Sequence, residues 1–215
     1  ITQILLETKG VFLNTAMTFK KIFSYKNIEL VYSEKVDEMI YNLRKIKSRD
    51  EFEKIQKAQE ITELAYQKVL KMIKPGVKES DIALELETEM RKAGAEGVSF
   101  DLITISGKKT SMPHGEPDEK LVENGDFVTM DIGALYKGYH SDMTRTVAVG
   151  FADDEMKKIY DIVLKAQLAA LNTVKAGVKC SDCDKAARDI ITESGYGDFF
   201  RHSTGHGVGL EIHEE

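Results

Sequence analysis

The sequence predicts an α+β fold in which a unit of two helices followed by β-strands occurs twice. Apolar residues recur every three or four positions over residues 48–73 and 153–174, and each stretch is followed by a second, shorter helical segment. Segments rich in β-branched residues or glycine follow each helix pair. Because the second copy stops at Glu215, we expect it to be incomplete.

The first 32 residues read as the end of a separate α/β unit. We expect short strands at residues 4–7 and 28–32, joined by a helix over 15–24. Two strands alone make a marginal sheet in water, and Ile1 stands where a complete chain would have Met. We therefore interpret residues 1–32 as the remnant of an N-terminal α/β domain.

The first repeat follows a connecting helix over residues 33–43. The sequence Ser-Arg-Asp-Glu has the form of a capping box and begins a long helix over 48–73, which a proline-glycine pair ends. Ser80 is expected to cap the next helix, which stops at a glycine. Residues 98–105 are then predicted to be one strand.

A strand pair completes the first repeat, and the second repeat begins after it. The strands are predicted over residues 126–135 and 139–149 with a tight connection between them. Helices are predicted over 153–174 and 181–194, the latter capped by its first serine. Residues 199–212 form a glycine-punctuated strand or loop.

Composition excludes several classes of protein. With 42% hydrophobic residues, 31% charged residues and three prolines, the chain has the material for a folded core. A net charge of -6 lacks the basic excess that nucleic-acid binding needs. No apolar run approaches the ~20 residues of a membrane span, and because residues 1–9 lack the basic and apolar segments of a signal peptide, we expect no export signal there. Cys180 and Cys183 suit a reducing environment, so we expect a cytoplasmic location.

Two aspartates of the predicted hairpin point to a cation site. A two-residue turn at Tyr136-Lys137 places Asp131 opposite Asp142, whereas a turn at Lys137-Gly138 places Asp142 opposite Gly133. Both registers keep the two carboxylates on one face, because side chains alternate with period two. Neighbouring carboxylates repel, so either one holds a raised pKa or a cation lies between them. The alternative is that both are turn-flanking acids that face solvent.

Histidines supply further candidate ligands. His114 lies in Met-Pro-His-Gly, and His202, His206 and His213 lie in the C-terminal run. Glycines on both sides of His206 permit close approach of the backbone to a ligand or a second strand. A helical zinc-protease pair is excluded because no Glu follows His202, and the glycine spacing does not fit a dinucleotide fingerprint.

Together these motifs resemble the metallopeptidase family with the pita-bread fold, which includes methionine aminopeptidases, Xaa-Pro aminopeptidases and Xaa-Pro dipeptidases. The resemblance covers residues 33–215 as the catalytic domain. It rests on five motifs: Leu43-Arg-Lys-Ile-Lys-Ser48, Pro113-His114, Met130-Asp131-Ile-Gly-Ala, Gly138-Tyr-His-Ser-Asp142-Met-Thr-Arg-Thr146, and Gly205-His206-Gly-Val-Gly-Leu-Glu-Ile-His213-Glu. The first and fourth are similar to the proline-specific branch. The resemblance thus implies a creatinase/aminopeptidase-like fold that lacks the C-terminal part of its second half.

The resemblance also implies roles for individual residues. Asp131 corresponds to a ligand of one metal ion, Asp142 to the carboxylate that bridges two, and His206 to the imidazole ligand. His114 and His213 correspond to the catalytic histidines that hold the substrate and its tetrahedral intermediate, and His202 to a position that binds substrate.

Two glutamate ligands of the family have no counterpart here. The chain stops before the strands that carry them, and Glu211, Glu214 and Glu215 do not match. We therefore predict that the 215-residue chain binds metal weakly and does not hydrolyse peptides by itself.

For the whole protein, the resemblance implies an aminopeptidase that cleaves between an N-terminal residue and a following proline. It implies two divalent ions; manganese is expected, and cobalt and zinc are the alternatives for the same donors. It also implies a homodimer. The alternatives are an Xaa-Pro dipeptidase (prolidase) and a non-catalytic peptide-binding member of the fold. A creatine-cleaving hydrolase shares the fold but lacks the metal ligands.

Overall fold

A computed structural model describes residues 2–214, which fall into two compact units, Ile1–Arg49 and Asp50–Glu215. The α+β class is confirmed. The domain boundary between residues 32 and 33 stays a prediction. None of the helices in the described range is both long and apolar enough to cross a membrane.

The first unit is a β-α-β arrangement with one further helix. Strands β1 (Gln3–Leu6) and β2 (Glu29–Tyr32) pair in parallel, and α1 (Leu13–Ser24) connects them. Helix α2 (Glu34–Lys45) follows, and its Asp37 carboxylate accepts hydrogen bonds from the backbone of the turn after β1. The predicted elements of this segment are confirmed to within two residues.

The core of the second unit lies between two helices and a sheet. Helices α3 (Arg49–Val69) and α4 (Glu79–Lys92) each bury one stripe of side chains at spacings of three and four. These stripes pack on Val128, Met130 and Ile132 of the sheet, all of them fully buried. The long helix ends at Val69 rather than at residue 73, and the apolar residues that follow it pack on the core from a turn.

The sheet is divided into two three-stranded pieces. Their orders are β3-β6-β7 and β4-β5-β8. The single strand predicted over residues 98–105 is therefore wrong, because β3 (Gly97–Val98) pairs with β6 and β4 (Ile103–Ser106) pairs with β5. The bend between them is fixed by Ser99, which donates hydrogen bonds to the carbonyls of Gly133 and Ala134.

The predicted hairpin is also broken near its middle. Its outer part pairs β5 (Phe127–Ile132) with β8 (Met143–Ala148), and its inner part pairs β6 (Ala134–Tyr136) with β7 (Tyr139–His140). A Cβ at Gly133 would overlap the carbonyl of Ser141, so the strands approach more closely there than a side chain allows. The amide of Ala134 donates instead to the hydroxyls of Thr62 and Ser141.

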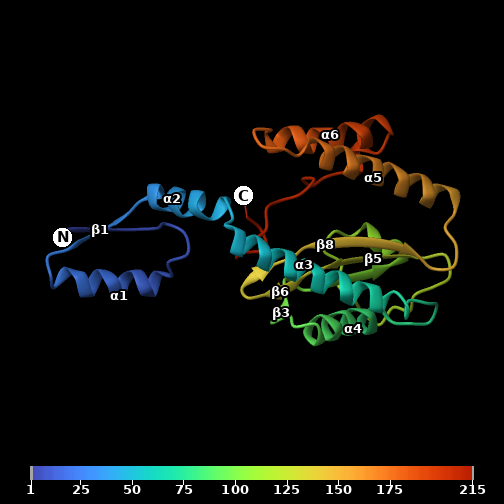
Figure 1. Ribbon diagram of the computed structural model, residues 1–215, viewed down its shortest axis with the longest axis horizontal. Coiled ribbons are helices and arrows are strands. Elements are labelled where there is room, and N and C mark those ends of the chain that lie inside the picture. Colours follow the sequence, from blue (N-terminus) through green and yellow to red (C-terminus); the bar gives the residue numbers. More distant parts are fainter. Residues whose placement is uncertain (1, 215) are drawn as a thin grey trace. The chain divides into compact units, whose positions relative to one another are not determined.

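The second helix pair follows the sheet. Figure 1 shows α5 (Asp154–Thr173) and α6 (Cys180–Glu193) as neighbouring helices. Asp153 caps α5 by accepting from the Met156 amide. The predicted caps Ser80 and Ser181 are wrong, because α4 and α6 each begin one residue earlier. Two short 3-10 turns complete the elements: η1 (Gly107–Ser111) and η2 (Gly197–Phe199).

Candidate metal centre

The turn of the hairpin decides how Asp131 and Asp142 are placed. Lys137 and Gly138 form the turn with φ of 48° and 78°, the left-handed pair that two-residue hairpins favour. Asp131 consequently lies opposite Thr144, and the register that puts Asp142 beside Gly133 is confirmed. The register with Asp131 directly opposite Asp142 is wrong, because it needs the turn one residue earlier.

Asp131 lies on the sheet face that turns away from the core. Its neighbours in β5, Met130 and Ile132, are fully buried, while Asp131 is half-buried, as alternation along a strand requires. The hydroxyl of Thr144 donates to its Oδ1 at 2.7 Å. Thr144 was not singled out from the sequence, although the correct register would have indicated it.

Asp142 is held in an electrostatically unfavourable position. Burial raises the pKa of its carboxyl above the ordinary value, and the negative charge of Asp131 beside it raises the pKa further. The neighbouring His206 and His213 act in the opposite direction. Asp142 is therefore half-buried near Asp131, His206 and His213, which favours the cation-site interpretation over that of a turn residue facing solvent.

His206 completes the pairing. Its Nε2 lies 3.3 Å from Oδ2 of Asp142, and its Nδ1 lies 2.9 Å from the carbonyl oxygen of Gly207. Because a carbonyl only accepts, Nδ1 carries the proton, and in a neutral ring Nε2 then faces the carboxylate with a lone pair. Two acceptors at this separation are stable only with a proton or a cation between them. The donor set therefore fits a divalent ion.

Close backbone contacts place His213 beside His206. The amide and carbonyl of Gly207 both bond to Glu214, and this closes a loop in which the His206 and His213 rings lie with centroids 4.1 Å apart. A Cβ at Gly207 would lie 2.8 Å from the Glu214 carbonyl oxygen, so only glycine permits this approach. The carbonyl of Gly209 accepts from the His140 amide and ties the loop to β7.

The other two candidate histidines are not brought into this cluster. His114 is exposed in the loop after η1, and it forms no hydrogen bond or ion pair with another described residue. His202 packs edge-on against the Phe200 ring, and its carbonyl accepts from Arg188. Their proposed roles remain predictions.

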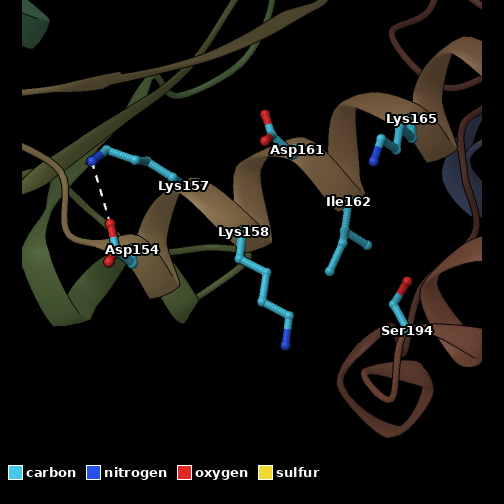
Figure 2. A pocket seen from close by; sticks show the side chains of 7 residues that line it. All are labelled: Asp154, Lys157, Lys158, Asp161, Ile162, Lys165 and Ser194. Atoms are coloured by element: carbon cyan, nitrogen blue, oxygen red, sulfur yellow. Dashed lines mark ion pairs between the residues drawn. The ribbon is translucent and has the colours of Figure 1, made fainter.

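The cluster is a partial ligand set. Between residues 2 and 214, no three or more His, Cys, Asp or Glu side chains gather in a geometry that could hold a metal ion. A hollow elsewhere on the surface, shown in Figure 2, contains none of the candidate residues; it is lined by Asp154, Lys157, Lys158, Asp161, Ile162, Lys165 and Ser194. Asp131, Asp142 and His206 therefore stay predicted ligands, of which the structure brings His206 into contact with Asp142.

Comparison with known proteins identifies the family to which the chain is similar. Residues 53–215 match the sequence model of metallopeptidase family M24. An Xaa-Pro dipeptidase of Pyrococcus furiosus is 41% identical over 215 residues, which are 100% of this chain and 62% of that protein.

Two solved structures show the same fold. A Bacillus anthracis Xaa-Pro dipeptidase has a TM-score of 0.93 and 43% identity, and the match covers 100% of this chain and 59% of that one. A Thermotoga maritima X-Pro aminopeptidase has a TM-score of 0.92 and 43% identity, covering 100% and 60%. The pita-bread fold is thus confirmed, and the chain spans about three fifths of the length of these relatives.

Proposed function

The chain belongs to metallopeptidase family M24, and we propose that the full-length protein hydrolyses the bond between an N-terminal residue and a following proline. The single observation that carries the proposal is the convergence of Asp142 with Asp131 and His206. Relatives named as Xaa-Pro dipeptidases and as an X-Pro aminopeptidase support the proline specificity. The substrate would be a peptide with proline in second position.

The chain's own residues would divide the work as follows. Asp131, Asp142 and His206 would hold two divalent ions. Such ions, when bound, supply an activated water and polarise the scissile carbonyl; manganese suits a carboxylate-rich set, and cobalt or zinc could replace it.

His213 and His114 would act on the substrate. The His213 ring lies beside the His206 ring. The imidazole of His213 would therefore donate a hydrogen bond to the oxyanion that develops on a substrate bound at His206. His114 would also donate a hydrogen bond, and His202 would contact the substrate. These interactions strengthen as charge develops on the carbonyl oxygen, which is what accelerates the reaction.

Titration calorimetry with Mn²⁺ tests the metal site. We expect tight binding by the full-length protein, weak binding by the 215-residue chain, and loss of binding in Asp142→Asn. Asp161→Asn removes the same charge from an exposed position on α5 and is the matched control. Tight binding of two ions by the short chain, or equal binding by both variants, would exclude the proposed ligand set.

Substrate assays separate the aminopeptidase from the second candidate, a dipeptidase. The names of the relatives support both, so an Xaa-Pro-Xaa tripeptide should be compared with an Xaa-Pro dipeptide. We expect cleavage of both, and cleavage of the dipeptide alone would favour the dipeptidase. Cleavage of neither by metal-loaded protein would favour a peptide-binding role. Dimer formation and a cytoplasmic location are further parts of the proposal, testable by sedimentation and by cell fractionation.

A further inference from the structure

A polar clamp on α6 holds the loop that leads to His206. The guanidinium of Arg188 donates to the carbonyl oxygens of Phe200 and His202, at 2.8 Å each. The carboxylate of Asp184 accepts from the amide of Thr204 at 2.9 Å and from its hydroxyl at 2.8 Å. Two side chains of one helix therefore fix three alternate residues of the loop.

Asp184 and Arg188 also bind each other. Arg188 donates to both oxygens of the Asp184 carboxylate, at 2.8 and 3.1 Å, and its guanidinium lies over the Phe200 ring. These donors hold the pKa of the Asp184 carboxyl well below its ordinary value, first through Arg188 and then through Thr204. The pair is thus charged at neutral pH, and each of its side chains bonds both its partner on α6 and the loop.

A second pair on the same helix provides the contrast. Lys185 and Asp189 have the same spacing and form an ion pair at 2.6 Å, but the hydrogen bonds of both side chains stay on α6. Charge pairing along a helix therefore does not by itself explain why Asp184 and Arg188 reach the loop.

The clamp lies next to the candidate site in the chain. Thr204 is two residues before His206, and beyond His206 the loop is tied down by the Gly207 pairing with Glu214 and by the Gly209 contact with β7. His206 is consequently fixed from both sides, by α6 on one and by the sheet on the other. We propose that Asp184 and Arg188 are positioning residues that set the distance between His206 and Asp142.

This inference rests on the proposed function for its metal readout, and a second readout is independent of it. Partners behind a metal ligand typically change metal affinity or activity by 10–100-fold when they are removed. In the full-length protein, we expect Arg188→Met to weaken Mn²⁺ binding by about tenfold and to lower kcat more than it raises KM. Asp189→Asn, the matched control, should leave both unchanged.

Thr204 offers a subtler pair of variants, useful if Arg188→Met fails to fold. Thr204→Val keeps the shape but removes the hydroxyl that donates to Asp184, whereas Thr204→Ser keeps it. We expect a few-fold loss of Mn²⁺ affinity in Thr204→Val and rescue in Thr204→Ser. Equal affinities in these two variants, together with Arg188→Met equal to Asp189→Asn, would overturn the proposal.

The independent readout is the His206 ring resonance in the metal-free full-length protein. It should shift in Arg188→Met and Thr204→Val and stay in place in Asp189→Asn and Thr204→Ser. If the wild-type protein neither binds Mn²⁺ nor hydrolyses peptides while the resonance shifts as expected, the proposed function fails and the positioning role stands. An unmoved resonance in all four variants would sink the positioning role whatever the activity.

Discussion

The two helix pairs of the second unit differ in how much they bury. Helices α3 and α4 enclose a large core with the strands of the sheet, and Ile61, Ile82 and Leu86 are fully buried in it. Helices α5 and α6 bury only a narrow line where they touch, formed among the described residues by Ala166, Ala170, Ala187 and Ile191. Similar helical periodicity therefore gives a wide core in one pair and a thin seam in the other.

Several apolar side chains of α5 lie outside the line of contact with α6 and remain exposed. Val163, Leu168 and Leu171 of α5 are 53, 48 and 61% exposed. The corresponding helix of the first pair covers a sheet, and an amphipathic helix gains most of its stability from such packing. Helical periodicity therefore specifies which face of a helix can be buried, and the strands that pack on that face decide whether it becomes buried.

The largest loss of stability is expected from truncating a buried side chain in the larger core, and the same change in the smaller core provides the comparison. Leu86→Ala should destabilise the chain by about 3–4 kcal/mol, because it leaves a cavity in a closely packed core. Ile191→Ala should cost about 2 kcal/mol, at the low end for such a truncation, since Ile191 retains 9% exposure and lies in a small cluster with Ala166, Ala170 and Ala187. Urea denaturation measures both, and equal losses would contradict the difference between the cores.

An intermediate loss of stability is expected where charged side chains of α6 hold the loop before His206. Asp184→Asn should destabilise the chain by about 1–2 kcal/mol at neutral pH. Because the pKa of Asp184 is lowered in the folded state, its contribution is present above the unfolded value of 3.8 and is lost as the pH falls below it. The difference in unfolding free energy between the wild type and Asp184→Asn should therefore become smaller in acid.

The control for this pH dependence is Asp189→Asn on the same helix. Its pair with Lys185 is exposed and screened by solvent, so its loss should change the stability at neutral pH much less than Asp184→Asn does. Denaturation curves at neutral pH and below pH 3.8 provide the measurement. A gap for Asp184→Asn that stays constant or widens in acid would show that its charge is not what stabilises the loop.

The smallest effect is expected on the exposed face of α5. Leu171→Ser should change the stability of the 215-residue chain by about 0.5 kcal/mol or less, because Leu171 is already 61% exposed. The same substitution should cost more in the full-length protein if further strands cover this face. Thermal denaturation of both forms compares the two, and a large loss in the short chain would mean that the face is already buried.

Much of the secondary structure follows from the sequence. The helices, the strands of the first unit and the hairpin were predictable because periodicity and turn residues are local signals. The break at Gly133, the bend at Ser99 and the first residues of α4 and α6 were not. Of these, the break, the bend and the start of α4 depend on partners distant in the chain, such as the Thr62 hydroxyl that bonds the Ala134 amide.

The sequence by itself determined that Asp131 and Asp142 share one face, since alternation along paired strands requires it under either turn. The tertiary structure decided the rest: which turn forms, that His206 comes within 3.3 Å of Asp142, and that Asp184 and Arg188 hold the approach to it. Those contacts join residues tens of positions apart. Their geometry is set by how helices and strands pack, which no local pattern in the chain records.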